Sequence, residues 1–277
     1  MFENMLQTTD EGAIRLAVFL GALVLFALLE TAFPRLHSDY PRARRWPGNL
    51  GIVVLDTLLA RVLLPGITVG ACLWAEVNGI GLFNLVTVPA AAEIAAVIVL
   101  FDLAIYAQHV VFHKVPVLWR LHRVHHTDPA FDVTTALRFH PIEILLSLLI
   151  KAGLAIALGA PAVAVVTFEM ILSAAAMFNH SNLRLPGWLD AGLRLVIVTP
   201  DMHRVHHSVM QPETDSNYGF NLSLWDRAFG TYRDQPLLGH DGMTVGQDGF
   251  ADDRVLGLNA LLIQPFQDRD GTLRRDA

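Results

Sequence analysis

Eight of the twelve histidines fall into groups whose spacing is typical of metal ligation, and His140 and His180 lie between these groups in the sequence. The sequence His-Arg-Val-His-His occurs at residues 122–126 and again at residues 203–207. An α-helix turns once every ~3.6 residues, so each repeat projects two or three imidazoles from one face. His109 and His113 add a pair at i, i+4, whose side chains stack on successive turns. Because imidazole is a preferred ligand of Zn, Cu, Fe and Ni, the pattern predicts a metal centre.

The predicted ligand set is too large for one ion. It comprises His109, His113, His122, His125, His126, His140, His180, His203, His206 and His207. So many imidazoles exceed the needs of one tetrahedral ion and suffice for two ions with open positions, which predicts a dinuclear site. His140 precedes Pro141, so it can instead cap a helix or act from outside the ligand set. His37 and His240 stand alone and are interpreted as ordinary polar side chains.

The composition places this centre in a membrane protein. Hydrophobic residues make up 53% of the 277-residue chain and charged residues only 17%, and about 20 apolar residues suffice to cross a bilayer as a helix. We predict spans at 14–33, 50–74 and 90–112, followed by a helical hairpin of 142–159 and 161–180. The predicted fold is an all-α, polytopic membrane bundle of about four to five membrane helices with a histidine-rich catalytic cap.

The basic residues predict how the bundle is oriented. Arginines and Lys114 lie in the segments after the first and third spans, whereas the loop 75–89 has no Lys or Arg. The positive-inside rule then puts every histidine box on the cytoplasmic side. The N-terminus lacks a basic stretch and a cleavage site, so the first span is expected to be retained. Only two of the twenty basic residues are lysine, a bias that favours a bacterial inner membrane.

Two carboxylates inside the spans are candidates for orienting metal ligands. Asp102 precedes His109 by seven residues, and Glu169 precedes His180 by eleven, which places each pair on one helical face. An intramembrane carboxylate is costly and often supports a metal-bound imidazole. Structural pairing with Lys151 or Arg61 is the alternative interpretation.

Several other kinds of chemistry have no support in the sequence. HExxH is absent, which argues against zinc proteolysis. Cys72 is the single cysteine, so the chain cannot form an internal disulfide framework or supply all the thiolates of an iron-sulfur cluster. No Gly-rich dinucleotide fingerprint follows a strand, so electrons are expected from a separate donor. Residues 251–264 are predicted to form a packing helix or an amphipathic membrane helix.

The histidine boxes resemble those of a known superfamily. The matching motifs are His109-Val-Val-Phe-His113, His122-Arg-Val-His125-His126, Phe139-His140-Pro141, Asn179-His180, His203-Arg-Val-His206-His207, Glu213-Thr-Asp-Ser-Asn-Tyr-Gly219 and Leu224-Trp-Asp-Arg-Ala-Phe-Gly-Thr-Tyr232. They are similar to the fatty acid hydroxylase/sterol desaturase superfamily, in its bacterial sterol-desaturase-like branch, over about 90–232. One position departs: fatty acid 2-hydroxylases carry a further histidine where this chain has Arg184.

The resemblance implies a membrane non-haem oxidoreductase with two iron ions, whose place zinc can take in purified protein. Such an enzyme uses dioxygen to hydroxylate a lipid, such as a sterol, fatty acyl chain or glycerol ether. It would receive electrons from a ferredoxin, cytochrome or reductase, and no nucleic-acid partner is expected. The implied domains are N-terminal membrane helices (1–89), a catalytic domain (90–232) and a cytoplasmic tail (233–277). Two alternatives stay open: a desaturase with the same site, and a non-enzymatic metal-binding or carrier protein.

Overall fold

A computed structural model describes residues 10–250 and 255–268, and these residues form helices joined by loops, with isolated bridges in place of strands. Residues 1–9, 251–254 and 269–277 of the predicted terminal regions lie outside the described part. The helices are α2 (Asp10–Ala32), α3 (Arg42–Leu63), α4 (Ile67–Val77), α5 (Leu82–Leu85), α6 (Ala90–Lys114), α7 (Pro116–His126), η1 (Thr135–Leu137), α8 (Pro141–Leu158), α9 (Ala162–Asn179), α10 (Gly187–Leu193), α11 (Pro200–His206), α12 (Gln211–Thr214), α13 (Leu224–Ala228), α14 (Gly239–Gly242), α15 (Leu258–Ile263) and η3 (Gln264–Phe266).

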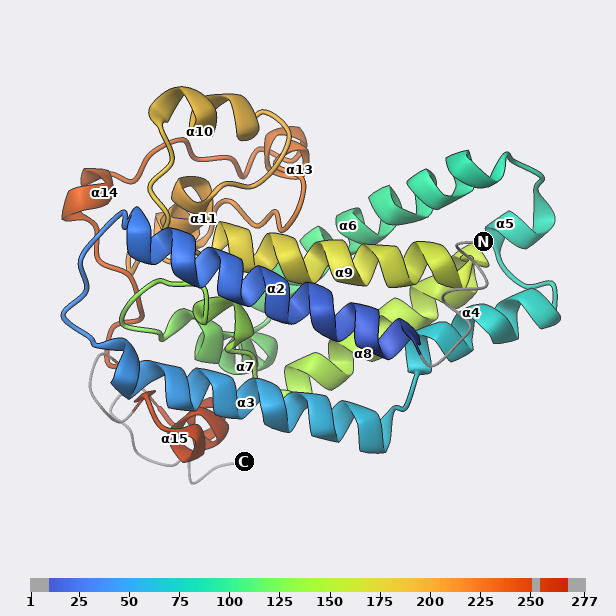
Figure 1. The fold of residues 1–277 in the computed structure, drawn as a ribbon, viewed down its shortest axis with the longest axis horizontal. Coiled ribbons are helices and arrows are strands. Elements are labelled where there is room, and N and C mark those ends of the chain that lie inside the picture. Colours follow the sequence, from blue (N-terminus) through green and yellow to red (C-terminus); the bar gives the residue numbers. More distant parts are fainter. Residues whose placement is uncertain (1–9, 251–254, 269–277) are drawn as a thin grey trace.

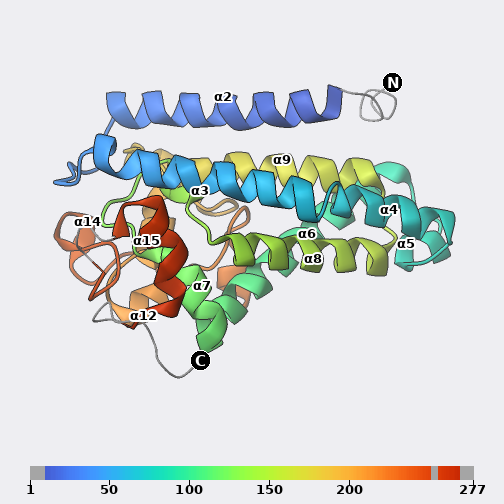
Figure 2. The same ribbon diagram turned by 90° about the horizontal axis from the view of Figure 1, so that it is seen from below.

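The long helices run lengthwise and the short ones gather at one end of the bundle (Figure 1). Five helical stretches of the described chain are long and apolar enough to cross a membrane, which confirms the predicted polytopic all-α class. In the perpendicular view α2 forms an outer layer beside α9 (Figure 2). Its outward face carries exposed Leu20, Val24 and Leu28, which suits contact with lipid tails.

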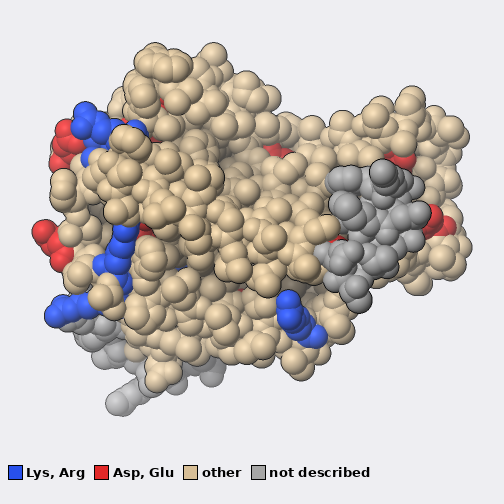
Figure 3. All heavy atoms as spheres, viewed as in Figure 1, with Lys and Arg blue, Asp and Glu red and all other residues tan. Residues whose placement is uncertain are grey.

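Charged side chains are unevenly spread over the molecule. On the face shown in Figure 3, most Lys, Arg, Asp and Glu side chains lie at the two ends, and the long middle carries few. The end that bears the short helices α7, α10, α11, α14 and α15 is called the cap here. This distribution fits a bundle that spans a membrane with its cap in water.

The second predicted span is not one helix. Residues 50–74 were expected to be continuous, but α3 ends at Leu63 and α4 begins at Ile67. Proline at 65 lacks an N–H and clashes with the preceding helical turn, and Gly66 adopts a left-handed conformation with φ 59°. The prediction of a single helix was therefore wrong at this position.

The predicted hairpin is confirmed. Helix α8 ends at Leu158 and α9 begins at Ala162, with Gly159 at φ 62° in between. A Cβ at Gly159 would lie 2.6 Å from Asn84 Nδ2, so the turn requires glycine. The helices pack around a core that includes Phe101 and Phe168, whose ring centroids are 5.3 Å apart. This core fixes α6 against α9, and both helices deliver histidines to the cap.

The C-terminal segment packs under the cap as a short helix. Leu261 of α15 is fully buried with Ile52 of α3 and Val124 of α7. Arg120 and Arg123 of α7 donate hydrogen bonds to backbone carbonyls of residues 264–267. Of the two interpretations of this segment, the structure shows the packing helix.

Candidate metal centre

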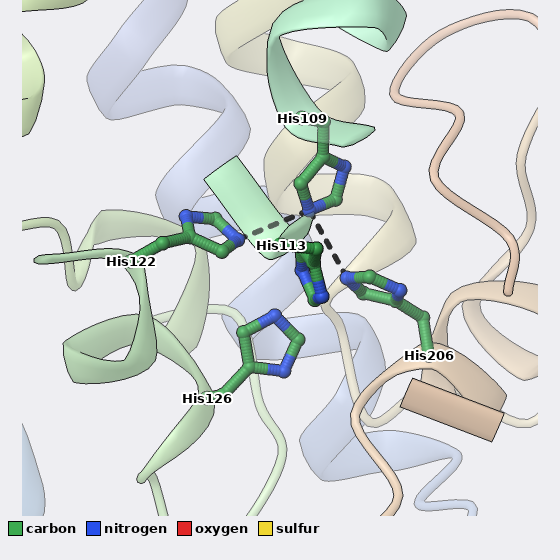
Figure 4. Close-up of side chains that lie close together, drawn as sticks. All are labelled: His109, His113, His122, His126 and His206. Carbon is green, nitrogen blue, oxygen red and sulfur yellow. Dashed lines mark hydrogen bonds between the residues drawn. The ribbon is translucent and has the colours of Figure 1, made fainter. Parts of the chain in front are cut away.

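Nine histidines converge in two clusters inside the cap. Cluster A comprises His109, His113, His122, His126 and His206, and cluster B comprises His125, His180, His203 and His207. Within each cluster, one ring nitrogen from every histidine lies within 4.8 Å of the others. In Figure 4 the five rings of cluster A turn toward a common point from α6, α7 and α11. The two clusters are neighbours, because the ring centroids of His126 and His207 are 4.4 Å apart.

Each His-Arg-Val-His-His repeat contributes to both clusters. On α7 the i, i+4 pair His122 and His126 joins cluster A, and His125 joins cluster B. The second repeat reverses this assignment: His203 and His207 join cluster B, and His206 joins cluster A. The i, i+4 members share one helical face, and the remaining histidine projects from another. The two repeats therefore lie between the clusters and bind them into one unit.

Proline starts both helices that carry the repeats. Pro116 occupies the first turn of α7, and Pro200 does so in α11, where it needs no hydrogen-bond partner for its nitrogen. The Thr199 side chain accepts a hydrogen bond from the Met202 N–H and caps α11. These N-termini fix where each helix begins, and thereby which side chains, the imidazoles among them, face inward.

Each cluster has a central histidine with two very close neighbours. His109 Nε2 lies 3.0 Å from Nε2 of His122 and of His206, and His180 Nε2 lies 3.0 Å from Nε2 of His125 and of His203. Two nitrogens bonded at right angles to one ion, each about 2.1 Å from it, would themselves be about 3.0 Å apart. The spacing therefore fits ligands that share an ion.

The protonation of these rings also fits metal binding. The Nδ1 atoms of His109 and His206 each lie 2.7 Å from a backbone carbonyl, that of Tyr218 and of Ser216. A carbonyl can only accept, so each Nδ1 carries the proton and each Nε2 presents a lone pair. Two lone pairs that face each other at 3.0 Å repel unless a cation lies between them. This arrangement of His109 and His206 is the strongest structural sign of a metal site.

Burial keeps the imidazoles neutral. It lowers the pKa of His122 to about 3 and, with smaller effects from neighbours, that of His180 to about 3. Burial, followed by repulsion from neighbouring histidines, also puts the pKa values of His125, His126, His203 and His207 well below the usual range. Neutral imidazole is the form that ligates metals.

Comparison with known proteins also points to the clustered histidines. The family profile described as fatty acid hydroxylase matches residues 94–231, which include all nine clustered histidines. The chain belongs to the fatty acid hydroxylase superfamily. No solved structure matches the chain at a significant level.

Its curated relatives within the superfamily include three kinds of protein. The chain is 30% identical over 179 residues to ornithine lipid hydroxylase OlsE of Rhizobium tropici, covering 64% of this chain and 51% of the relative. It is 30% identical over 131 residues to human alkylglycerol monooxygenase (47% and 28%) and 26% identical over 233 residues to mouse cholesterol 25-hydroxylase (79% and 74%). The chain thus spans about half or less of the first two relatives.

The superfamily motifs beyond the last box hold the backbone that supports the ligands. The carboxylate of Asp226 accepts hydrogen bonds from the N–H groups of Tyr218 and Gly219 at 2.7 and 2.9 Å. These bonds fix the loop whose Tyr218 carbonyl accepts the proton of His109 Nδ1. Asn217, at φ 51°, donates to the carbonyls of Met202 and Arg233 and ties the loop to α11. Orientation of a metal ligand through such partners is a common requirement of metal sites.

A buried ion network holds the loop after α7. Arg45 of α3 donates to both carboxylate oxygens of Asp128 at 2.7 Å and to Asp132 at 2.6 Å. Burial raises the pKa of Asp128, but the charges of Arg45 and Arg138 outweigh it and lower that pKa to about 2. Asp128 follows His126 by two residues, so this network anchors the end of the first repeat.

A cavity of about 570 Å³ runs from cluster A into the membrane-spanning bundle. His109 and His122 border it, together with Phe112, Phe139 and Leu148, whereas none of the cluster B histidines does. Its size and mostly apolar lining are typical of a small-molecule site.

His140 does not join the other nine predicted ligands. Its Nδ1 accepts a hydrogen bond from the Ile142 N–H, and its Nε2 donates to the Leu262 carbonyl, both at 3.2 Å. The ring thus caps α8 and contacts the C-terminal segment, so the structure places it outside both clusters. This is the capping role that Pro141 at the next position also favours.

The two predicted carboxylates do not contact the histidines either. Asp102 Oδ2 accepts hydrogen bonds from Trp225 Nε1 and the Leu222 N–H, which attaches α6 to the loop before α13. Glu169 forms ion pairs with Lys151 at 2.8 Å and Arg15 at 2.6 Å. Glu169 therefore has the structural role of the alternative interpretation: it pairs with Lys151, as that interpretation expected, and with Arg15 in place of Arg61.

Sequence reasoning missed the carboxylate that does contact a ligand. Glu143, in the first turn of α8, lies 2.6 Å from Nδ1 of His122 through its Oε1. It is 4% exposed, and its Oε2 accepts no hydrogen bond from the described residues. Its position two residues after Pro141 was the available signal, because Pro141 begins the helix that presents it.

Proposed function

We propose that the chain is an integral membrane oxidoreductase that uses dioxygen to hydroxylate a lipid, with two iron ions held by clusters A and B. The observation that carries this proposal is the cavity that leads from the membrane-spanning bundle to His109 and His122. The printed names of the relatives point the same way, since they describe hydroxylation of ornithine lipid and of cholesterol and monooxygenation of alkylglycerol. When bound, the iron ions would supply the dioxygen and one-electron chemistry that side chains lack.

The protein's residues would hold and shield this centre. Backbone carbonyls of Tyr218 and Ser216 keep the Nδ1 protons on His109 and His206 and turn Nε2 inward. Glu143 Oε1 lies 2.6 Å from Nδ1 of His122 and fixes the orientation of that ring. All nine clustered histidines except His113 are at most 3% exposed, so bulk water is kept from the reacting end of the cavity.

The lipid would reach the centre from the bilayer. The cavity is bordered by α2, α3, α4, α6, α8 and α9, so an alkyl chain within it would lie among apolar side chains of the spans. We also propose that the cap faces the cytoplasm of a bacterial inner membrane and receives electrons there from a separate ferredoxin, cytochrome or reductase.

The proposal is tested by lipid mass spectrometry of cells that express the chain under oxygen-18 gas. Wild type should form lipids that carry one heavy oxygen, and His206→Ala should form none, because it removes a ligand of cluster A. His37→Ala is the matched control, since His37 is exposed and outside both clusters, and it should retain full product.

Other outcomes would change the assignment. Unlabelled lipids lighter by two hydrogens would show a desaturase instead. Equal lipid profiles in wild type and His206→Ala, with a supplied electron donor and iron bound to the purified protein, would contradict oxygenation and favour a metal-binding protein. The metal itself is checked by elemental analysis of protein purified from iron-supplemented cells, where about two iron ions per chain are expected.

A further inference from the structure

One carboxylate on the cavity wall has an oxygen without a hydrogen-bond partner among the described residues. Asp56 lies in the middle of α3, is 5% exposed and borders the cavity. No described residue donates a hydrogen bond to its Oδ1. A buried polar atom without a partner costs about 1–3 kcal/mol, and more when charged. An ionisable side chain inside a membrane bundle is therefore by default a candidate functional group.

The charged groups around the cavity do not satisfy Asp56. Lys151 and Arg15, which also border the cavity, are held by Glu169. Glu143 also borders the cavity, but its Oε1 lies against His122 Nδ1 and not against Asp56. Arg61, on the same helix, is exposed and forms no ion pair with Asp56. The remaining way to satisfy Oδ1 is a donor that enters the cavity.

We propose that Asp56 accepts a hydrogen bond from a hydroxyl or amide N–H group of the lipid, so that the substrate class is a lipid with a neutral hydrogen-bond donor. This inference rests on the proposed function, because it concerns the lipid bound in the same cavity. Asp56 borders the same cavity as His122 and as Glu143, which contacts His122, so the donor would lie in the cavity that ends at these histidines. The bond would fix which carbon of the chain lies beside His109 and His122.

A neutral donor fits the cavity better than a cationic one. A lipid ammonium group would have to leave water, which costs far more for an ion than for a hydroxyl. A plain hydrocarbon, in turn, would leave Asp56 unsatisfied, and sites built around a hydrogen bond discriminate strongly against analogues that lack it.

The first experiment measures binding with a matched pair of probes. Purified full-length protein in phosphatidylcholine nanodiscs is offered equal amounts of 1-octadecanol and its methyl ether, and the retained probe is counted by mass spectrometry. Wild type should retain the alcohol over the ether by about fivefold, as expected for one hydrogen bond. Asp56→Leu should bring this ratio to about one.

Two further variants guard against misfolding and general effects on the cavity. Asp56→Asn keeps the size and an acceptor oxygen, so it should retain part of the preference that Asp56→Leu loses. Thr57→Val is the matched control: Thr57 borders the same cavity, but its hydroxyl donates to the Val53 carbonyl, so the ratio should stay as in wild type. An unchanged ratio in both Asp56 variants, a wild-type ratio near one, or stronger retention of octadecylamine than of octadecanol would each overturn the inference.

The oxygen-18 experiment separates this inference from the proposed function. A wild-type preference for the alcohol that depends on Asp56, without any labelled product, would uphold the recognition role and contradict the oxygenase. Labelled product formed equally well from the alcohol and the ether by wild type would uphold the oxygenase and overturn the role of Asp56.

Discussion

Clusters A and B are built from the same sequence repeat, yet their surroundings differ. The central histidines His109 and His180 are equivalent, since each donates Nδ1 to a backbone carbonyl and approaches two other Nε2 atoms at 3.0 Å. Cluster A, however, borders the cavity and includes His122, the ligand held by a carboxylate. In cluster B, Nδ1 of His125 and of His203 has no hydrogen-bond partner among the described residues.

This difference indicates that the two clusters have different roles. Cluster A borders the cavity and has an acidic residue, Glu143, against one of its ligands. Cluster B is enclosed by protein, with Phe131 against His180 and His207. Because each repeat supplies histidines to both clusters, the two sites are held at a fixed separation. Two metal ions that take part in the same oxidation would require such a separation.

The largest effect should follow from removing either central histidine. His109→Ala and His180→Ala should each lower the bound metal by about one ion and the turnover by more than about 100-fold, since even changes outside the ligand set cost 10- to 100-fold. Elemental analysis and oxygen-18 product counts measure both effects. Turnover within about tenfold of wild type in His180→Ala alone would break the comparison, because cluster B would then not take part in the reaction.

Glu143→Gln should weaken cluster A selectively. The amide keeps the volume but replaces the carboxyl group that contacts His122 Nδ1, so we expect a 10- to 100-fold loss of metal affinity or activity, as is usual for such partners. The rate of metal loss to a chelator measures the affinity. Glu169→Gln is the control, because its carboxylate pairs with Lys151 and Arg15 away from the histidines, and its metal should leave at the wild-type rate.

Acid should destabilise the metal-free protein through both clusters. The pKa values of His122 and His180 are lowered to about 3 in the folded state, against about 6.5 in an unfolded chain. Between these values the unfolded chain binds more protons, so the free energy of unfolding falls as pH drops below about 6.5. The melting temperature of chelated protein in detergent should therefore fall by several degrees from pH 7.5 to 5.5. A melting temperature that stays level or rises over this range would show that the histidines are not buried as described.

The sequence was sufficient for part of this arrangement and insufficient for the rest. Spacing predicted that each repeat projects two or three imidazoles from one helical face, but it left open whether the i, i+3 or the i, i+4 pair acts together. In the structure the i, i+4 pairs, His122 with His126 and His203 with His207, each lie in one cluster. Whether His125 or His206 joins its own pair or the opposite cluster depends on how α7 and α11 face each other, which local spacing does not encode. For the same reason Asp102, with the right helical phase, turned out to contact Trp225.

The smallest expected effect concerns His140, where the sequence pattern predicts a metal ligand and the structure shows a helix cap. It stands beside Pro141 like a ligand of the superfamily pattern, yet its two ring nitrogens bond to Ile142 and Leu262. His140→Ala should therefore cost about 1 kcal/mol of stability, the usual value of a lost helix cap, with the metal content unchanged. His140→Asn should restore most of this loss, because asparagine is among the best capping residues. A loss of about one ion in His140→Ala, not recovered in His140→Asn, would instead make His140 a tenth ligand and extend one cluster toward the C-terminal helix.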